Sequence, residues 1–107
     1  MSQRGDLVTV SLQGDFGKPR PALVVQSGLL ADLDSVVLCP VTSDVRTAAF
    51  RVTVEPGAGN GLRALSQIMV DKLSTLPRGK VGEAFGRLDD ERMRAVDRAL
   101  LLVLGLI

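Results

Sequence analysis

The sequence predicts a mainly β protein that ends in one α-helix, arranged as a small, strongly curved antiparallel sheet or open barrel. Short apolar segments with strand patterning follow one another from the N-terminus as far as Leu88. One segment with helical spacing and helix-capping residues then runs from Asp89 to Gly105. A chain of 107 residues is long enough for one domain with its own core, so we expect residues 1–107 to form a single domain.

The expected strands are of two kinds. Leu7–Leu12 and Phe50–Glu55 alternate apolar and polar residues, which is the period of a strand with one buried face. Ala22–Gln26 and Val36–Val41 are nearly continuous apolar runs that should be buried on both faces. Two further strands are expected at Gln67–Asp71 and Glu83–Leu88.

Two loops separate these strands. Gln13–Pro19 is a loop by its glycines and proline. Pro56–Gly61 is rich in glycine, and we expect it to be a flexible loop with little to fix it.

The helix has signals at both of its ends. Asp89 is a favoured N-cap residue, and the carboxylates that follow it suit the positive end of the helix dipole. Leu88 and Met93 are spaced to form a hydrophobic staple across this cap. Gly105 stands where a glycine commonly ends a helix.

The helix is expected to bury one stripe of side chains. Met93, Val96, Leu100 and Val103 follow the spacing of such a stripe. The segment Ala99–Leu104 is apolar on every side, so we expect it to pack deeply or to meet a second subunit. It is far shorter than the ~20 residues that a bilayer crossing requires.

Composition excludes several kinds of chemistry. The chain has no histidine, which removes the commonest acid/base group and metal ligand. Its one cysteine, Cys39, lies in an apolar run and is expected to be buried, not a nucleophile or a ligand. No cluster has metal-ligand spacing, so neither a metal nor another cofactor is expected.

The net charge of +1 predicts no bulk attraction to polyanions. The N-terminus lacks the apolar stretch of a signal peptide, and we expect a cytoplasmic protein.

The most informative motif joins Arg20-Pro21 to Thr42-Ser43. Arg20 leads into one buried strand, and the two hydroxyl residues end the next. This arrangement can bring one guanidinium and two hydroxyls to a shared strand edge, where they would suit a phosphate diester. The alternatives remain open at this point. Arg20 could be a solvated loop residue, and both hydroxyls could bond backbone groups in the turn before Asp44.

Five fragments together span nearly the whole chain: Arg4-Gly5-Asp6-Leu7-Val8, Arg20–Gln26, Pro40–Ser43, Val70–Lys72 and Leu104–Leu106. In their order and spacing they resemble MazF/PemK-type toxins. Members of that family are sequence-specific endoribonucleases of bacterial toxin-antitoxin pairs, with an SH3-like barrel that acts as a homodimer.

The resemblance implies roles for particular residues. Arg20 and Thr42 would act at the scissile phosphate, with Ser43 and Asp71 also in the RNA site. Attack by the RNA 2′-hydroxyl would give a 2′,3′-cyclic phosphate and a 5′-hydroxyl without a metal. The segment Arg46–Phe50 resembles the substrate-contacting segment of the PemK/Kid branch. That branch also uses a first-loop histidine and an arginine where this chain has Met69, so the histidine-dependent mechanism is not expected here.

Several further residues are candidates for supporting contacts with single-stranded RNA. Phe16, in a polar glycine loop, is the better base-stacking candidate, because Phe50 fits a core position on an alternating strand. Lys18, Arg46 and Lys72 would add phosphate contacts if they line one groove with Arg20.

Partners and a second function class follow from the same resemblance. The expected partners are a cognate antitoxin, with a disordered acidic tail over the Arg20 groove, and a second copy of the chain. The same fold serves CcdB-like toxins, which bind DNA gyrase and have no nuclease site. That class, and a nuclease-dead interaction protein of the same fold, are the alternatives. The absence of tryptophan argues against gyrase binding, because CcdB-like proteins present one near the C-terminus.

Overall fold

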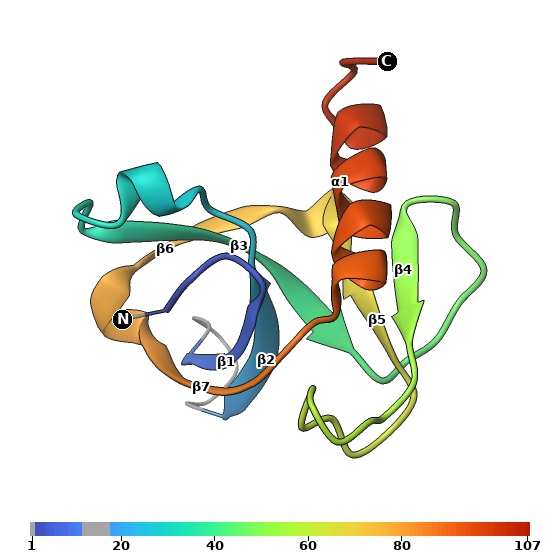
Figure 1. The fold of residues 1–107 in the computed structure, drawn as a ribbon, viewed down its shortest axis with the longest axis horizontal. Coiled ribbons are helices and arrows are strands. Elements are labelled where there is room, and N and C mark those ends of the chain that lie inside the picture. The colour runs from blue at the N-terminus through green and yellow to red at the C-terminus, as the bar shows by residue number, and fades with distance from the viewer. Residues whose placement is uncertain (1, 12–17) are drawn as a thin grey trace.

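Seven strands and one α-helix make up the structure, a computed structural model that describes residues 2–11 and 18–107 (Figure 1). The antiparallel sheet has the order β4-β5-β3-β2-β1-β7, and β6 pairs with the first half of β3. Three short 3-10 turns, η1 to η3, connect the strands. The elements are β1 (Asp6–Ser11), β2 (Pro19–Val24), η1 (Gly28–Leu30), β3 (Ser35–Thr42), β4 (Arg51–Val54), β5 (Ser66–Met69), η2 (Val70–Lys72), β6 (Ser74–Pro77), η3 (Arg78–Lys80), β7 (Val81–Arg87) and α1 (Asp90–Val103).

The six expected strands are all present, with ends shifted by a few residues. The predicted mainly β fold with an antiparallel sheet and one C-terminal α-helix is confirmed, and the sheet is not closed into a barrel. The strand β6 was not predicted. Its sequence, Ser-Thr-Leu-Pro, is too short and too polar to show a hydrophobic period. It forms because the long strand β3 offers it a partner, with Leu76 opposite Val36.

The core consists of two hydrophobic clusters. One includes Leu23 and Ile68 together with Val96 of α1, so this cluster lies between the sheet and the helix. The other includes Ala22 and Val24. Consecutive residues of β2 therefore point into different clusters, and the prediction that this run is buried on both faces is confirmed.

The helix begins and ends as its sequence predicts. The Asp89 carboxylate accepts a hydrogen bond from the backbone N–H of Arg92 at 2.7 Å. At the other end, Gly105 has φ of +73° and its N–H donates to the Leu102 carbonyl. The N–H of Leu106 donates to the Leu101 carbonyl, which completes a Schellman motif. Leu88 and Met93 both pack in the cluster beneath the helix, as the staple predicts.

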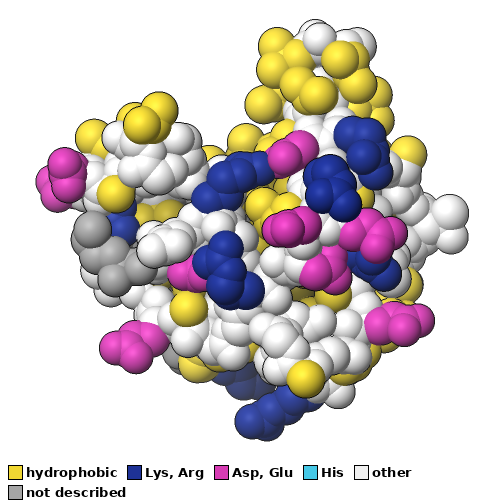
Figure 2. All heavy atoms as spheres, in the orientation of Figure 1, with side chains coloured by type: hydrophobic (Ala, Val, Ile, Leu, Met, Phe, Trp, Pro, Cys, Tyr) yellow, Lys and Arg dark blue, Asp and Glu magenta, His cyan; other side chains and the backbone are white. Residues whose placement is uncertain are grey.

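The last turn of α1 extends beyond the sheet, so the predicted buried stripe is shorter than expected (Figure 1). Val96 is fully buried, but Val103 is 36% exposed, and the placement of Val103 in the stripe is wrong. Deep packing of the helix end is also wrong, because Leu102 and Leu104 are exposed. Apolar side chains gather at this end of the molecule (Figure 2). In the described part of the chain, no helix combines the length and the apolar character that a membrane crossing needs.

The segment around Arg4-Gly5-Asp6 ties the sheet to the helix. Arg4 forms an ion pair with Asp97 of α1 and donates to the Val25 carbonyl. Asp6 forms an ion pair with Arg87 at the end of β7. Gly5 has φ of +95°, a conformation that favours glycine. This family-like fragment therefore has a structural role at the junction of β1, β7 and α1.

Candidate functional site

The strand register brings Arg20 and Thr42 to the same edge of the sheet. β2 and β3 run antiparallel, with Ala22 opposite Pro40. Two residues further along each strand, Arg20 comes opposite Thr42, beyond the last paired positions. Arg20 is also paired with Val10 of β1, which fixes its backbone from the other side. The shared strand edge predicted from the sequence is present.

A cavity of about 600 Å³ opens at this edge. Arg20 of β2, Thr42 at the end of β3 and the following Ser43 line it, together with Arg63 and Phe85. Among the described residues that line it, there are two guanidinium groups and no carboxylate. This cavity is therefore suited to an anionic ligand.

The Thr42 side chain bonds a backbone group in the turn, and this bond is compatible with a contact to a ligand. Its Oγ1 accepts a hydrogen bond from the backbone N–H of Asp44 at 3.0 Å, as expected for a turn residue. That bond uses the oxygen as an acceptor and fixes the side-chain orientation. The hydroxyl hydrogen can still be donated to a ligand in the cavity.

The loop between β4 and β5 was expected to be flexible, and this prediction is wrong. Asn60 Oδ1 accepts from the N–H of Gly57 at 3.1 Å and of Leu62 at 2.9 Å, while its Nδ2 donates to the Glu55 carbonyl at 2.9 Å. The Gly59 carbonyl accepts from the N–H of Arg87 at 2.9 Å. A glycine-rich loop is thus held by one asparagine side chain and by the end of β7.

Two glycines allow this loop to lie directly on β7. A Cβ atom on Gly86 would lie 2.2 Å from the Asn60 carbonyl oxygen. Gly61 has φ of +69°, and a Cβ there would lie 2.8 Å from Cδ1 of Phe85. Only residues without a side chain permit so close a contact. The contact places the loop and Phe85 on the same wall of the cavity.

The other predicted site residues lie outside the described lining of this cavity. Lys18 is exposed and precedes Pro19 at the start of β2. Arg46 forms an ion pair with Asp44 at 2.8 Å. Its backbone bonds the side chain of the buried Gln67. Arg46 lines a separate, smaller hollow with Arg51.

Two of the predicted site residues lie on η2, on the side of the sheet next to α1. These are Asp71 and Lys72, both exposed. Phe50 is 36% exposed, so its expected core position is wrong. It immediately precedes β4, where the chain has not yet entered the sheet. Phe16 lies outside the described residues.

Sequence reasoning missed Arg63 and Phe85. Arg63 stands in a segment, Gly-Leu-Arg-Ala, that has no strand or helix period, and Phe85 is on a strand that is mostly exposed. Only the folded loop brings them to the same cavity as Arg20. The one available signal was the pair of glycines, Gly61 and Gly86, which indicates close approach of two backbones.

Cys39 takes no part in the cavity. It is fully buried, as predicted. Burial raises the pKa of its thiol to about 12; the nearby Asp71 carboxylate adds to this rise and Arg4 opposes it. The thiol therefore stays protonated at neutral pH, and a nucleophilic role is excluded.

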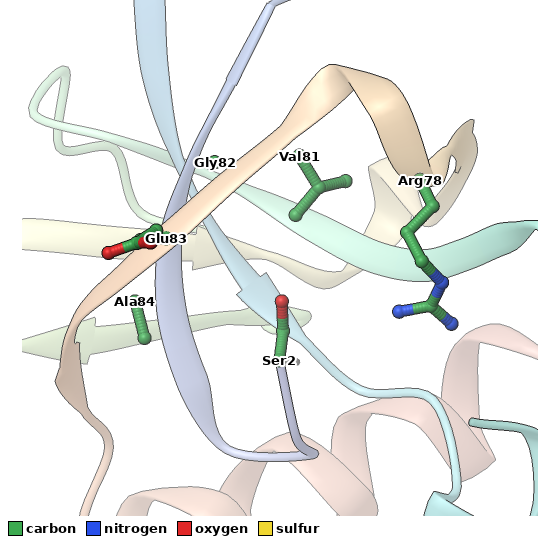
Figure 3. A pocket seen from close by; sticks show the side chains of 6 residues that line it. All are labelled: Ser2, Arg78, Val81, Gly82, Glu83 and Ala84. Carbon is green, nitrogen blue, oxygen red and sulfur yellow. The ribbon is translucent and has the colours of Figure 1, made fainter. Parts of the chain in front are cut away.

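A second cavity, of about 490 Å³, lies beside the N-terminal segment and is lined by Arg78 and Glu83 (Figure 3). The Arg78 guanidinium donates to the carbonyls of Leu33 at 3.0 Å and Ala31 at 3.1 Å, so it holds the η1 loop in place. With the Glu83 carboxylate on its wall, this cavity is less suited to a phosphate. Among residues 2–11 and 18–107, no three His, Cys, Asp or Glu side chains gather as a metal site would require.

Fold and cavity together define a small, open antiparallel β domain with a cationic cavity at the edge between β2 and β3. A family model described as PemK-like, MazF-like toxin of type II toxin-antitoxin system matches residues 3–104. The chain belongs to this family.

Individual relatives agree with this membership. Probable endoribonuclease MazF of Mycolicibacterium smegmatis is 39% identical over 106 residues, which are 97% of this chain and 97% of the relative. The solved structure of Mycobacterium tuberculosis toxin MazF-mt6 has a TM-score of 0.81 at 27% identity, covering 94% of this chain and 96% of that chain.

A mycobacterial endoribonuclease solved with its cognate antitoxin is similar in fold, with a TM-score of 0.86 at 22% identity. That match covers 100% of this chain and 98% of the other. The resemblance inferred from the motifs is confirmed, and it favours the nuclease class over the gyrase-binding class.

Proposed function

We propose that the cavity between β2 and β3 holds the scissile phosphodiester of single-stranded RNA, and that Arg20 and Thr42 act on it. Family membership places the chain among the MazF-like endoribonuclease toxins. The observation that carries the proposal is the position of Arg20 opposite Thr42 in one cationic cavity. RNA supplies its own nucleophile, the 2′-hydroxyl, so the protein needs only to position the strand and stabilise developing charge.

Arg20 is suited to charge stabilisation. A guanidinium is planar and can donate two parallel hydrogen bonds to phosphoryl oxygens. Its proton is hard to remove, with a pKa above ~12, so Arg20 is a poor general base. In the proposed reaction it stabilises the negative charge that accumulates on the phosphoryl group.

Thr42 and Ser43 would complete the contacts to the phosphate. The bond from Asp44 N–H to Thr42 Oγ1 holds that hydroxyl in one orientation before substrate arrives. A preorganised donor of this kind is typically worth about 10²–10³ in rate. We expect Thr42 to contribute in this range.

The proposed reaction is a transesterification. The 2′-oxygen bonds to phosphorus and loses its proton, while the bond from phosphorus to the 5′-oxygen breaks and that oxygen gains a proton. The products are a 2′,3′-cyclic phosphate and a 5′-hydroxyl. The proposed RNA site also includes four residues outside the cavity. They are Asp71, the carboxylate that the family pattern implies, and the cations Lys18, Arg46 and Lys72. Those four lie beyond the cavity lining and would contact RNA flanking the cut.

The experiment is cleavage of a long unstructured RNA in EDTA, followed by mapping and end-group analysis of the fragments. Wild type should give discrete cuts that bear cyclic phosphate. Arg20→Ala should cut at least about 10²-fold more slowly, while Arg94→Gln, which removes an exposed charge from α1, should cut like wild type. Intact RNA across many sequence contexts would overturn the proposal.

The proposed protein partners are a second copy of the chain and a cognate antitoxin. The exposed apolar end of α1, which includes Leu102 and Leu104, would form the contact between two copies. An acidic antitoxin segment would cover the cavity that holds Arg20 and block RNA. Native mass spectrometry should show a dimer that Leu104→Asp weakens; a monomer alone at micromolar concentration would contradict the dimer.

A further inference from the structure

We infer that Arg63 and Phe85 form a nucleotide subsite next to the scissile phosphate, in which Arg63 binds the neighbouring phosphate and Phe85 stacks on its base. The inference rests on the proposed function, because it extends the same cavity. Neither residue belongs to the motifs through which the chain resembles its family. Both line the same cavity as Arg20.

Arg63 is exposed, and the residues on both sides of it are fixed. The preceding residue, Leu62, packs against the hydrophobic core. The carbonyl of the following residue, Ala64, accepts a hydrogen bond at 2.9 Å from Ser66, which is itself buried. Asn60 also bonds the N–H of Leu62. The guanidinium therefore projects from a defined point, which lowers the entropy lost when it binds a phosphate.

Charge points to a second phosphate as the ligand of Arg63. The described lining of the cavity brings two guanidiniums together without a carboxylate among them. Because phosphates are spaced regularly along a strand, one cation at the scissile phosphate and one at its neighbour would fix both position and direction of the RNA.

Phe85 provides an apolar face beside this cation. It is one of only three aromatic residues in the chain, and 39% of it is exposed even though it is on a strand. Its ring edge lies against Gly61, so the ring is held by the loop that carries Arg63. An aromatic face next to a phosphate-binding cation is the arrangement that single-stranded nucleic acid sites use, and it tolerates any base.

The test measures binding and needs no cleavage. The probe is a short 2′-fluoro RNA pool of randomised sequence, which has no 2′-hydroxyl to act as the nucleophile. An abasic phosphodiester oligomer of the same length is the second probe. Arg63→Gln and Phe85→Leu are compared with wild type and with Arg94→Gln, over a range of salt concentrations. Circular dichroism confirms that each variant is folded.

The expected pattern separates the two residues. Arg63→Gln should weaken binding of both probes by about 10- to 100-fold. It should also reduce the salt slope, the steepness with which the logarithm of the binding constant falls with the logarithm of the salt concentration, by about 0.7, the value of one phosphate contact on a single strand. Phe85→Leu should weaken the base-bearing pool by about 5- to 100-fold and leave both the abasic oligomer and the salt slope unchanged.

The subsite is overturned if Arg63→Gln binds like Arg94→Gln, or if Phe85→Leu weakens both probes equally. These failures differ from failure of the proposed function. If RNA is cut normally but the binding pattern is absent, the subsite is wrong and the nuclease stands. If the binding pattern is present but wild type cuts no RNA, the subsite stands and the proposed chemistry is wrong.

Discussion

Replacing Asn60 by alanine should release the loop that forms one wall of the cavity. The change removes three hydrogen bonds, two accepted by Oδ1 and one donated by Nδ2. A typical intramolecular hydrogen bond contributes about 0.5–1.5 kcal/mol to stability. Water can replace part of this at a half-exposed site, so Asn60→Ala should lower the free energy of unfolding by about 1.5–3 kcal/mol. Asn60→Asp keeps the acceptor and loses the donor, so it should cost about one third as much.

The assay combines two measurements. Urea unfolding followed by circular dichroism gives the stability, and it suits a chain without Trp or Tyr. Hydrogen exchange locates the change, because the amides of Gly57 and Leu62 lose their acceptor in Asn60→Ala. Those two amides should exchange much faster, and RNA binding should weaken although no cavity residue is altered. Unchanged exchange at both amides would refute the view that Asn60 fixes the loop.

Three further outcomes follow from the structure. Gly86→Ala forces a Cβ against the Asn60 carbonyl and should cost about 1–3 kcal/mol in urea unfolding; equal stability would contradict the close contact. Asp89→Ala removes the helix cap and should cost about 1 kcal/mol, measured by thermal unfolding, with Asp89→Asn nearly neutral. The Cys39 thiol has its pKa raised to about 12 from 9.0, so it stays protonated when folded while the unfolded thiol ionises. Stability should therefore fall between pH 9 and 12, by up to about 4 kcal/mol, and Cys39→Ala should show a shallower fall.

Local signals explain what could be predicted from the sequence. The ends of α1 depend on Asp89 and Gly105, whose effects reach only neighbouring residues. The predictions of both helix ends are confirmed. The burial of β2 on both faces follows from its unbroken apolar run. The prediction that Arg20 lies opposite Thr42 needed one more assumption, that the two apolar strands pair as neighbours. This assumption also holds.

Contacts between distant segments explain what could not be predicted. The loop at residues 56–61 has a flexible composition, yet the Asn60 side chain and β7 hold it. The exposure of Val103 depends on where the sheet ends beneath α1. The helical spacing of the apolar residues carries no information about that position. Arg63 and Phe85 become cavity residues only through the contact that Gly61 and Gly86 allow. The Asn60 hydrogen bonds are local, but the other deciding partners lie far away in the sequence.

The chemistry proposed for this cavity makes its rigid frame as important as its charged groups. Without histidine, and with the Cys39 thiol protonated at neutral pH, the cavity would rely on fixed charge and on an oriented hydroxyl. Such groups accelerate a reaction only if they are already in place when charge develops. Strand pairing fixes Arg20 and a backbone N–H orients Thr42, while the Asn60 hydrogen bonds hold the loop that carries Arg63. Loosening that loop should therefore weaken RNA binding even in a variant that keeps every charge of the cavity.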